Sequence, residues 1–477
     1  MNTPHFLAFL LLASLHYSAL SDSGSVGINY GRLGDNLPSP AKVVQLLKSQ
    51  GVTKVKLYDS DSSVLSAFSG SGISLTLGLP NDNLASAAAS TSYTDSWVES
   101  NVLPFHPKTT IEAIAVGNEV FANSATTPTS ALLPAMKNVY ASLEKHNLSS
   151  SIKISSPVAL SALNSSYPPS AGAFKPDLIE PVIKPMLHFL NQTNSYMMVN
   201  AYPFFAYIDN TDTISLDYAL LRNSAAGNPD SGNGLVYKSL FEAQTDAVFA
   251  AMSAVGFNDI KIVITETGWP SKGDEKEVGA TPENAAAYNG NLVRRVLSGG
   301  GTPLRPKDSL NVFLFALFNE NQKTGPMSER NYGLFYPNED KVYDIPLTLD
   351  GLNGKPNNTE SKAQVPAPAA TAVVAAEPAP AVRAAGQTWC VASENVGEEK
   401  LQAALDYACG EGGADCRPIQ REAACFNPNT VEAHASYAFN SYYQKNSRLS
   451  GSCDFGGAAH VVTQAPKFGS CDFPTGY

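Results

Sequence analysis

Residues 261–271, KIVITETGWPS, decide the fold prediction because they combine a buried strand with an abrupt polar end. Residues 262–265 are apolar or β-branched, which is typical of a strand buried on both faces. Glu266 follows at once, and then come a glycine, Trp269 and Pro270, a residue that cannot continue a strand ladder. A carboxylate beside an indole ring suits a sugar site. A surface glutamate with a core tryptophan is the alternative, and this stretch alone leaves both open.

Length and charge limit the possible class of protein. The 477 residues exceed one hydrophobic core, which predicts two domains. The formal net charge is −11 and no long Lys/Arg run occurs, which argues against nucleic acid and anionic membranes as partners. No Gly-rich phosphate loop, Ser-His-Asp spacing or His/Asp metal cluster is found, so we expect neither a cofactor nor a metal.

The sequences at both ends of the chain help to predict its cellular location. The apolar run at residues 6–15 is too short to span a bilayer, and the small residues after it predict a signal peptide over 1–21. An N-terminal core helix is the alternative. The C-terminus has no apolar tail for a glycolipid anchor, so we expect a secreted protein of the extracellular space or cell wall without a membrane anchor. Four glycosylation motifs agree with secretion: Asn147, Asn164, Asn191 and Asn357.

The first 350 residues alternate short apolar segments with helical patterns. Strands are predicted at 26–29, 53–58, 73–79, 111–119, 152–157, 196–202, 262–265 and 310–317. Helices are predicted at 40–50, 62–68, 95–103, 132–146, 179–190, 235–255 and 282–297. Eight strands that alternate with helices predict a (β/α)8 TIM barrel over residues 24–350.

Polar groups and aromatic rings follow the predicted strands, at the end where such barrels carry their chemistry. These are Tyr58, Asn118, Glu119, Tyr202, Glu266 and Glu320. Two glutamates across a barrel mouth suit glycoside hydrolysis, because one carboxyl protonates the leaving oxygen and the other attacks or activates water. We therefore predict that Glu119 and Glu266 are catalytic. Asn118 could bind a sugar hydroxyl, or it could cap a helix.

The composition changes after the predicted barrel. Pro/Ala repeats within residues 351–386 predict an extended linker. Residues 387–473 hold all six cysteines: Cys390, Cys409, Cys416, Cys425, Cys453 and Cys471. An even count in a short segment predicts a small disulfide-rich module, mainly helical at 398–409 and 431–444. Six cysteines allow fifteen pairings on sequence grounds alone.

Five motifs carry a resemblance to a known family. They are VGINYG at 26–31, VGNE at 116–119, NAYPFF at 200–205, TETGWPS at 265–271 and LFNENQK at 317–323. With them, residues 24 to about 345 resemble plant glycoside hydrolase family 17, the endo-1,3-β-glucanases. The resemblance implies a retaining mechanism on 1,3-β-glucan (callose or fungal wall glucan), with Glu266 as nucleophile and Glu119 as proton donor.

The resemblance also implies supporting residues. Glu320 and Lys323 would lie beside the site and tune the carboxylates, with Lys323 holding Glu266 ionised; a purely structural ion pair is the alternative. Substrate contacts are expected from Tyr58, Asn118, Asn200, Tyr202, Trp269 and Phe318. A transglycosylase would have the same residues. A non-catalytic, wall-binding barrel is a further alternative, although the intact glutamates favour an enzyme, which we expect to be monomeric.

Residues 388–472 resemble the plant six-cysteine module, carbohydrate-binding module family 43, through WCVA at 389–392 and YAFNSYYQ at 437–444. The resemblance implies binding of 1,3-β-glucan. It also implies the pairs Cys390–Cys453, Cys409–Cys416 and Cys425–Cys471. Of the aromatic residues Tyr437, Phe439, Tyr442 and Tyr443, we expect two to be exposed for sugar contacts.

Overall fold

The computed structural model describes residues 24–122, 129–223, 226–353, 388–393, 396–410, 414–421, 423–445, 448, 452–453, 455, 458–468 and 471–475. The chain divides into two compact units, Met1–Ala363 and Gln364–Tyr477. The predicted signal peptide lies outside the described residues, as does the predicted linker beyond residue 353. Helix α12, Leu349–Leu352, crosses the boundary that the sequence analysis set at residue 350.

Parallel strands form the centre of the first unit, in the order β5-β4-β3-β2-β1-β13-β12-β9-β6. Their bounds are β1 Ser25–Tyr30, β2 Lys54–Leu57, β3 Ser74–Leu79, β4 Thr110–Val116, β5 Lys153–Ser155, β6 Pro157–Ala159, β9 Met197–Asn200, β12 Ile262–Thr267 and β13 Asn311–Leu314. Only Ser156 separates β5 from β6, yet β5 pairs with β4 and β6 pairs with β9. One split strand therefore closes the sheet, which confirms the eight-stranded barrel.

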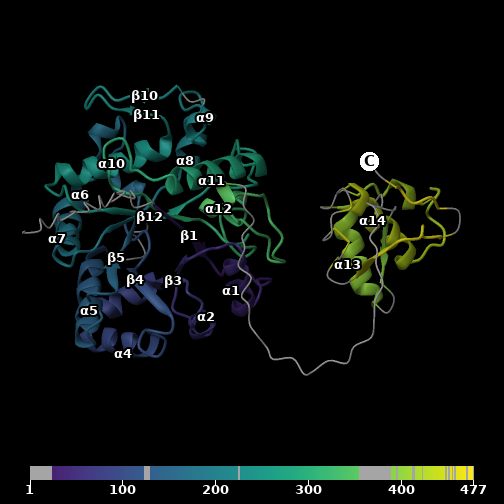
Figure 1. Ribbon diagram of the computed structural model, residues 1–477, viewed down its shortest axis with the longest axis horizontal. Helices are drawn as coiled ribbons and strands as arrows, with labels where there is room; N and C mark the ends of the chain where they lie inside the picture. The colour runs from purple at the N-terminus through teal and green to yellow at the C-terminus, as the bar shows by residue number, and fades with distance from the viewer. Residues whose placement is uncertain are drawn as a thin grey trace, which may run out of the picture. The chain divides into compact units, whose positions relative to one another are not determined.

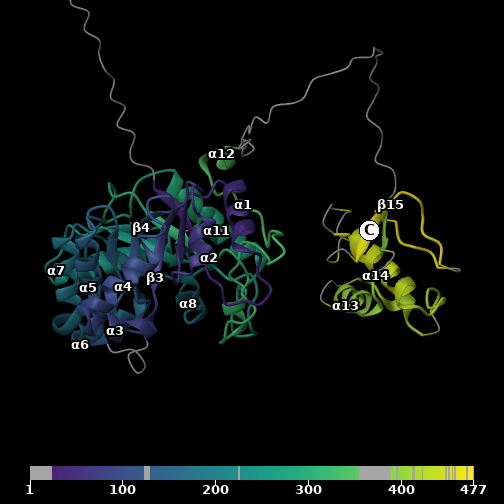
Figure 2. The ribbon, with the colours of Figure 1, turned by 90° about the horizontal axis from the view of Figure 1, so that it is seen from below.

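Helices lie around the outside of these strands, as Figure 1 and Figure 2 show. The longer ones are α1 Pro40–Ser49, α4 Thr91–Asn101, α5 Leu132–Lys145, α7 Lys184–Gln192, α10 Leu240–Ala254 and α11 Pro282–Leu297. The shorter ones are α2 Ser62–Ala67, α3 Leu84–Ala89, α6 Pro176–Leu178, α8 Pro203–Ile208 and α9 Leu216–Ala219. Short strand pairs sit between them: β7 Leu163–Ser165 with β8 Ala173–Phe174, and β10 Asn228–Pro229 with β11 Val236–Tyr237.

Helix α11 illustrates how local sequence sets these elements. The Thr281 side chain caps it by accepting a hydrogen bond from the amide of Asn284, and Pro282 occupies the first turn, where its missing N–H costs nothing. Tyr288, Leu292 and Val296 recur at four-residue spacing and are fully buried. Burying each such side chain stabilises the fold by about 1.5–3 kcal/mol. Through this packing α11 lies against β1 and β13.

Two predicted helices differ in the structure. The helix expected at 235–255 begins at Leu240, because Ser239 caps it and Val236–Tyr237 instead pair with Asn228–Pro229. The helix expected at 179–190 is a π-helical turn, Ile179–Ile183, followed by α7. Pro181 and Pro185 lie in this segment, and a proline cannot donate a helical hydrogen bond. This accounts for the irregular winding of the helix.

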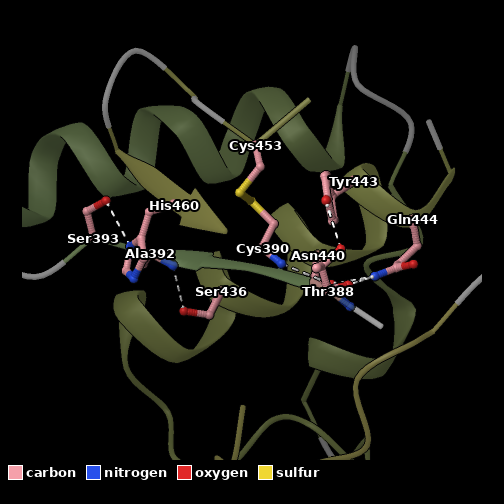
Figure 3. Close-up of a disulfide and its surroundings, with 10 residues drawn as sticks. All are labelled: Thr388, Cys390, Ala392, Ser393, Ser436, Asn440, Tyr443, Gln444, Cys453 and His460. Carbon is pink, nitrogen blue, oxygen red and sulfur yellow. Dashed lines mark hydrogen bonds between the residues drawn. A yellow bond between two sulfur atoms is a disulfide. The ribbon is translucent and has the colours of Figure 1, made fainter. Parts of the chain in front are cut away.

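The second unit is a small disulfide-bonded module. Strands β14 Trp389–Ala392 and β15 Ala459–Val462 pair antiparallel beside helices α13 Glu398–Cys409 and α14 Val431–Lys445. The disulfides are Cys390–Cys453, Cys409–Cys416 and Cys425–Cys471, which confirms the three expected pairs. Figure 3 shows how α14 holds β14: the side-chain oxygens of Asn440 and Ser436 accept hydrogen bonds from the amides of Cys390 and Ala392.

Candidate active site

A cleft of about 910 Å³ opens at the carboxyl ends of the barrel strands. Both predicted catalytic glutamates, Glu119 and Glu266, line it. Other predicted site residues on its wall are Tyr58, Asn118, Asn200, Tyr202, Glu320 and Lys323. Residues of β2, β4, β9 and β12 that lie far apart in the sequence meet here because parallel strands end at one edge of a barrel.

Glu266 is buried near the end of β12 and is held on both carboxylate oxygens. The ammonium of Lys56 donates to its Oε1 at 2.8 Å, and the hydroxyl of Tyr202 donates to its Oε2 at 2.8 Å. Burial alone would raise the pKa of Glu266, but the charge of Lys56 and the hydrogen bonds from Lys56, Tyr202 and Tyr58 lower it below the ordinary value. The surroundings therefore favour the ionised form of Glu266.

Lys56 was not found by the sequence analysis. It lies on β2 between two apolar residues, where alternation indicates a side chain that faces the barrel interior. Its side chain is fully buried, and its ammonium lies 3.9 Å from the centre of the Tyr58 ring. A buried lysine needs a carboxylate partner, and this signal could have identified it.

Asn29 supports the same wall from β1. Its amide donates to the hydroxyl of Tyr58 at 3.1 Å and to the carbonyl of Thr265 at 2.9 Å. These bonds position the ring beside Glu266 and fix the backbone directly before that residue. Asn29 therefore helps to position Glu266 through Tyr58 and Thr265.

Glu119 follows β4 in a strained turn. Gly117 has φ +68° and Glu119 has φ +51°, a region that non-glycine residues seldom adopt. A Cβ at Gly117 would also lie 2.8 Å from Val120, so glycine is required there. The side chain of Asn81 holds the turn: it donates to the carbonyl of Asn118 and accepts from the amide of Asn118. The turn directs Glu119 into the cleft.

Asn200 joins Glu119 to Thr265, the residue directly before Glu266. Its amide nitrogen donates to Oε1 of Glu119 at 2.9 Å, while its oxygen accepts from the hydroxyl of Thr265 at 2.8 Å. Burial and the negative charge of Glu266 raise the pKa of Glu119, although the bond from Asn200 and the charge of Lys56 oppose this. The pKa values of Glu119 and Glu266 thus move in opposite directions.

Glu320 and Lys323 lie on one wall of the cleft. Glu320 accepts a hydrogen bond from the amide of Leu33 at 2.7 Å, and a Cβ at Gly31 would lie only 2.4 Å from its carboxylate. Burial raises the pKa of Glu320 despite the nearby charge of Lys323. Lys323 contacts Glu329, at 3.4 Å. The expectation that Lys323 holds Glu266 ionised is wrong, because Lys56 occupies that place.

Two expected substrate contacts are also wrong. Trp269 is fully buried: its ring packs on Phe204 and Tyr288, and its indole nitrogen donates to the carbonyl of Gly279 at 2.8 Å. Phe318 is buried against Tyr30, because the chain after β13 pairs with the segment at Phe335. Neither ring can reach a sugar. The exposed apolar groups on the cleft wall are Leu33 and Phe205.

Comparison with known proteins gives the family. Residues 26–347 match the model of glycosyl hydrolases family 17, and residues 388–460 match that of the X8 domain. The chain belongs to glycosyl hydrolases family 17. It is therefore a glycoside hydrolase with an appended X8 domain.

Relatives of this family 17 enzyme match over nearly its whole length. A glucan endo-1,3-β-D-glucosidase of Olea europaea is 42% identical over 99% of this chain and 97% of its own. Glucan endo-1,3-β-glucosidase 12 of Arabidopsis thaliana is 40% identical over 99% of this chain and 88% of its own. A solved structure of a β-1,3-glucanase and allergen of Cryptomeria japonica pollen has 42% identity and a TM-score of 0.65, covering 68% of this chain and 99% of that one.

The X8 domain of the family 17 enzyme differs from expectation in its aromatic residues. Tyr437, Phe439 and Tyr443 are buried and Tyr442 is half-buried, so the expected two exposed rings on this helix are not found. Helix α14 packs against both α13 and β14, which leaves little of it exposed. Among the described residues of this domain, the exposed aromatic ring is Tyr407 on α13, which is 48% exposed and 6.2 Å from the ring of Tyr442.

Two further expectations concern the surface of the family 17 enzyme. Three glycosylation candidates, Asn147, Asn164 and Asn191, are exposed, whereas Asn357 lies outside the described residues. Within the part of the chain that the structure describes, no helix has the length and apolar character needed to cross a membrane.

Proposed function

We propose that the protein is an endo-1,3-β-glucanase that cleaves 1,3-β-glucan with retention of configuration. The carrying observation is the opposite pKa displacement of two glutamates in one cleft, lowered at Glu266 and raised at Glu119. A glycosidase, retaining or inverting, needs one ionised and one protonated carboxyl at the start of its cycle, and the assignment of retention rests on the family to which the chain belongs. The names of the relatives supply the substrate class, because they act on 1,3-β-glucosidic bonds.

In the first step, the Glu266 carboxylate attacks the anomeric carbon while Glu119 gives its proton to the departing glycosidic oxygen. The bond from carbon to that oxygen breaks, and an ester between the sugar and Glu266 forms. Lys56 and Tyr202 hold the Glu266 oxygens, so the carboxylate enters the step already oriented.

In the second step, Glu119 is ionised and takes a proton from water, and the water oxygen displaces Glu266 from the anomeric carbon. Each displacement inverts the configuration, so two restore it. Asn200 donates to Glu119 and can stabilise its ionised form at this stage. The distance between the two carboxyl groups is expected to be about 5 Å, as retention requires.

The X8 domain and the cellular location complete the proposal. The domain binds insoluble 1,3-β-glucan and keeps the barrel near its polymer substrate. Secretion is supported by the three disulfides, which persist in oxidising compartments. The chain acts outside the cell, on callose or on the glucan of fungal walls.

The proposal is tested with a soluble 1,3-β-glucan. Release of reducing ends and a rapid fall in mean polymer length are expected from the wild type, and neither from Glu266→Gln. Proton NMR of the first products should show the β-anomer. Products longer than the starting oligosaccharide would identify a transglycosylase instead, and an initial α-anomer would exclude retention.

A further inference from the structure

A second cavity, of about 970 Å³, lies at the opposite end of the barrel from the catalytic cleft. The amino-terminal ends of several strands line it, including Lys54 at the start of β2, Lys153 at the start of β5 and Lys261 directly before β12. The segment before β13, with Arg305 and Lys307, forms another wall. Its size is that of a pocket for a small ligand, at the upper limit of about 1,000 Å³.

The cavity is positively charged although the chain is acidic. Five cations and two carboxylates, Glu112 and Asp308, line it, which leaves a net charge of +3 in a chain of net charge −11. Lys54 is neutralised by Glu112 at 2.7 Å. Within the described residues, Lys153, Lys261 and Lys307 make no ion pair or side-chain hydrogen bond. Unpaired cations gathered in one cavity favour an anionic ligand.

Arg305 supplies an independent observation. Its guanidinium lies over the Phe249 ring at 5.2 Å and donates through one terminal nitrogen to the carbonyl of Asn258. Its Nε–H is buried and has no partner among the described residues. A buried donor without an acceptor is costly, and a small shift of the guanidinium on binding a ligand would satisfy it.

We propose that this cavity binds a short acidic oligosaccharide, a chain of uronic acid residues. The lysines are spread rather than focused on one point. Lys153 and Lys261 begin strands two places apart in the sheet, roughly 10 Å at the usual strand spacing. Cations spread along one wall match carboxylates on successive sugars of an oligosaccharide. Ile262 and Phe313 on the same wall are largely buried and add only a small apolar surface.

The test measures binding of a galacturonic acid trimer to the full-length protein by isothermal titration calorimetry. The wild type should bind the trimer saturably, should bind it more weakly as salt is added, and should not bind a neutral galactose trimer. The triple variant Lys153→Gln/Lys261→Gln/Lys307→Gln should bind the uronate trimer about tenfold more weakly, because three charge contacts are lost. Its turnover of soluble 1,3-β-glucan should equal that of the wild type, because these side chains lie at the other end of the barrel.

The matched control replaces three exposed lysines outside the cavity, Lys48, Lys108 and Lys137, with glutamine. It removes the same charge and should keep wild-type affinity for the uronate trimer. Equal loss in both triple variants, or no saturable binding by the wild type, would overturn the proposal. Inorganic phosphate that competes as well as the trimer would identify an adventitious small-anion site only, and so would also overturn it. If the triple variant fails to fold, Lys261→Gln alone, which changes an exposed side chain, must still weaken trimer binding.

Discussion

The ammonium of Lys56 lies 2.8 Å from Oε1 of Glu266, and both side chains are buried. Two charges of opposite sign are therefore paired in a site that is shielded from water. Lys56 lies on β2 and Glu266 on β12, on different sides of the barrel mouth. Such a pair gives little net stability, but removing one partner leaves an uncompensated charge and costs about 3–5 kcal/mol. We infer that the role of Lys56 is to keep Glu266 ionised.

Replacing Lys56 with methionine should therefore impair catalysis through Glu266. Losing the cation raises the pKa of Glu266, so activity, which needs the ionised form, is lost at a higher pH as the solution is acidified. We expect kcat to fall about 100-fold, the size of one lost electrostatic contact at a reacting group. Full pH profiles of kcat/KM measure both effects.

Two companion variants separate this role from a structural one. Lys56→Arg keeps the charge and should restore the acidic limb of the profile. Lys54→Met removes a lysine from the same strand whose partner is Glu112, and it should leave the profile unchanged. An unshifted acidic limb in Lys56→Met would disprove the role of Lys56.

The pH dependence of the wild type follows from the two displaced pKa values. The proposed mechanism requires ionised Glu266 and protonated Glu119. The lowered pKa of Glu266 places the acidic limb below the ordinary glutamate value of 4.5, and the raised pKa of Glu119 places the basic limb above it. We expect a bell-shaped kcat/KM profile with its maximum on the acidic side of neutral. A profile that still rises above about pH 8 is incompatible with Glu119 as proton donor.

A nucleophile-less variant gives a chemical test of the assigned roles. Glu266→Gly should lose nearly all hydrolysis, and azide should partly restore it, because a small anion can occupy the vacated position. The product should be the α-glycosyl azide, inverted relative to the substrate. Glu119→Gly should give the β-glycosyl azide from an activated substrate with a good leaving group. If both variants gave the same anomer, the two roles could not be distinct.

The barrel was predictable because its signals are local. Apolar runs such as 73–79 and the Thr281 cap of α11 indicate their elements without reference to the rest of the chain. The closing strand was also identified, although its split at Ser156 was not. That split depends on pairing with β4 on one side and β9 on the other, which the sequence of the strand does not express.

The site was predicted less completely. The ends of the predicted strands indicated Glu119 and Glu266, and both line the cleft. The predicted cation beside Glu266 was wrong. Lys323 was expected there, but it pairs with Glu329. Lys56, which is distant in sequence, forms the ion pair with Glu266. Trp269 was mistaken because its ring packs inward on Phe204 and Tyr288 rather than into the cleft.

Trp269 and Phe205 should therefore respond differently to substitution. Trp269→Ala empties a fully buried site that joins α8, α11 and the loop at Gly279, and should destabilise the barrel by about 3–5 kcal/mol. Phe205→Ala removes a ring that is 36% exposed on the cleft wall, and should raise KM several-fold with little change in Tm. Thermal unfolding and steady-state kinetics on both variants check this. A lowered Tm in Phe205→Ala, with unchanged KM, would assign that ring to the core.

The last prediction concerns the X8 domain. Truncation after Gly354 should abolish sedimentation with insoluble 1,3-β-glucan and leave turnover of short soluble oligosaccharides unchanged. The physical reason is effective concentration: a tethered binding domain raises the local concentration of barrel and polymer but contributes nothing to a substrate already in solution. Pull-down and reducing-end assays on the same preparations measure the two properties.

A point variant makes the test sharper. Tyr407, Tyr442 and Phe455 form a group with ring centres 5.3–6.4 Å apart, in which Tyr407 is exposed. Tyr407→Ala in the full chain should weaken pull-down about tenfold, since an exposed aromatic contact is worth about 0.5–1.5 kcal/mol. Val461→Ala changes an exposed apolar residue on β15 and serves as the control. If the truncated barrel sediments as well as the full chain, docking by the domain is wrong; if soluble turnover collapses too, the domain instead supports the barrel.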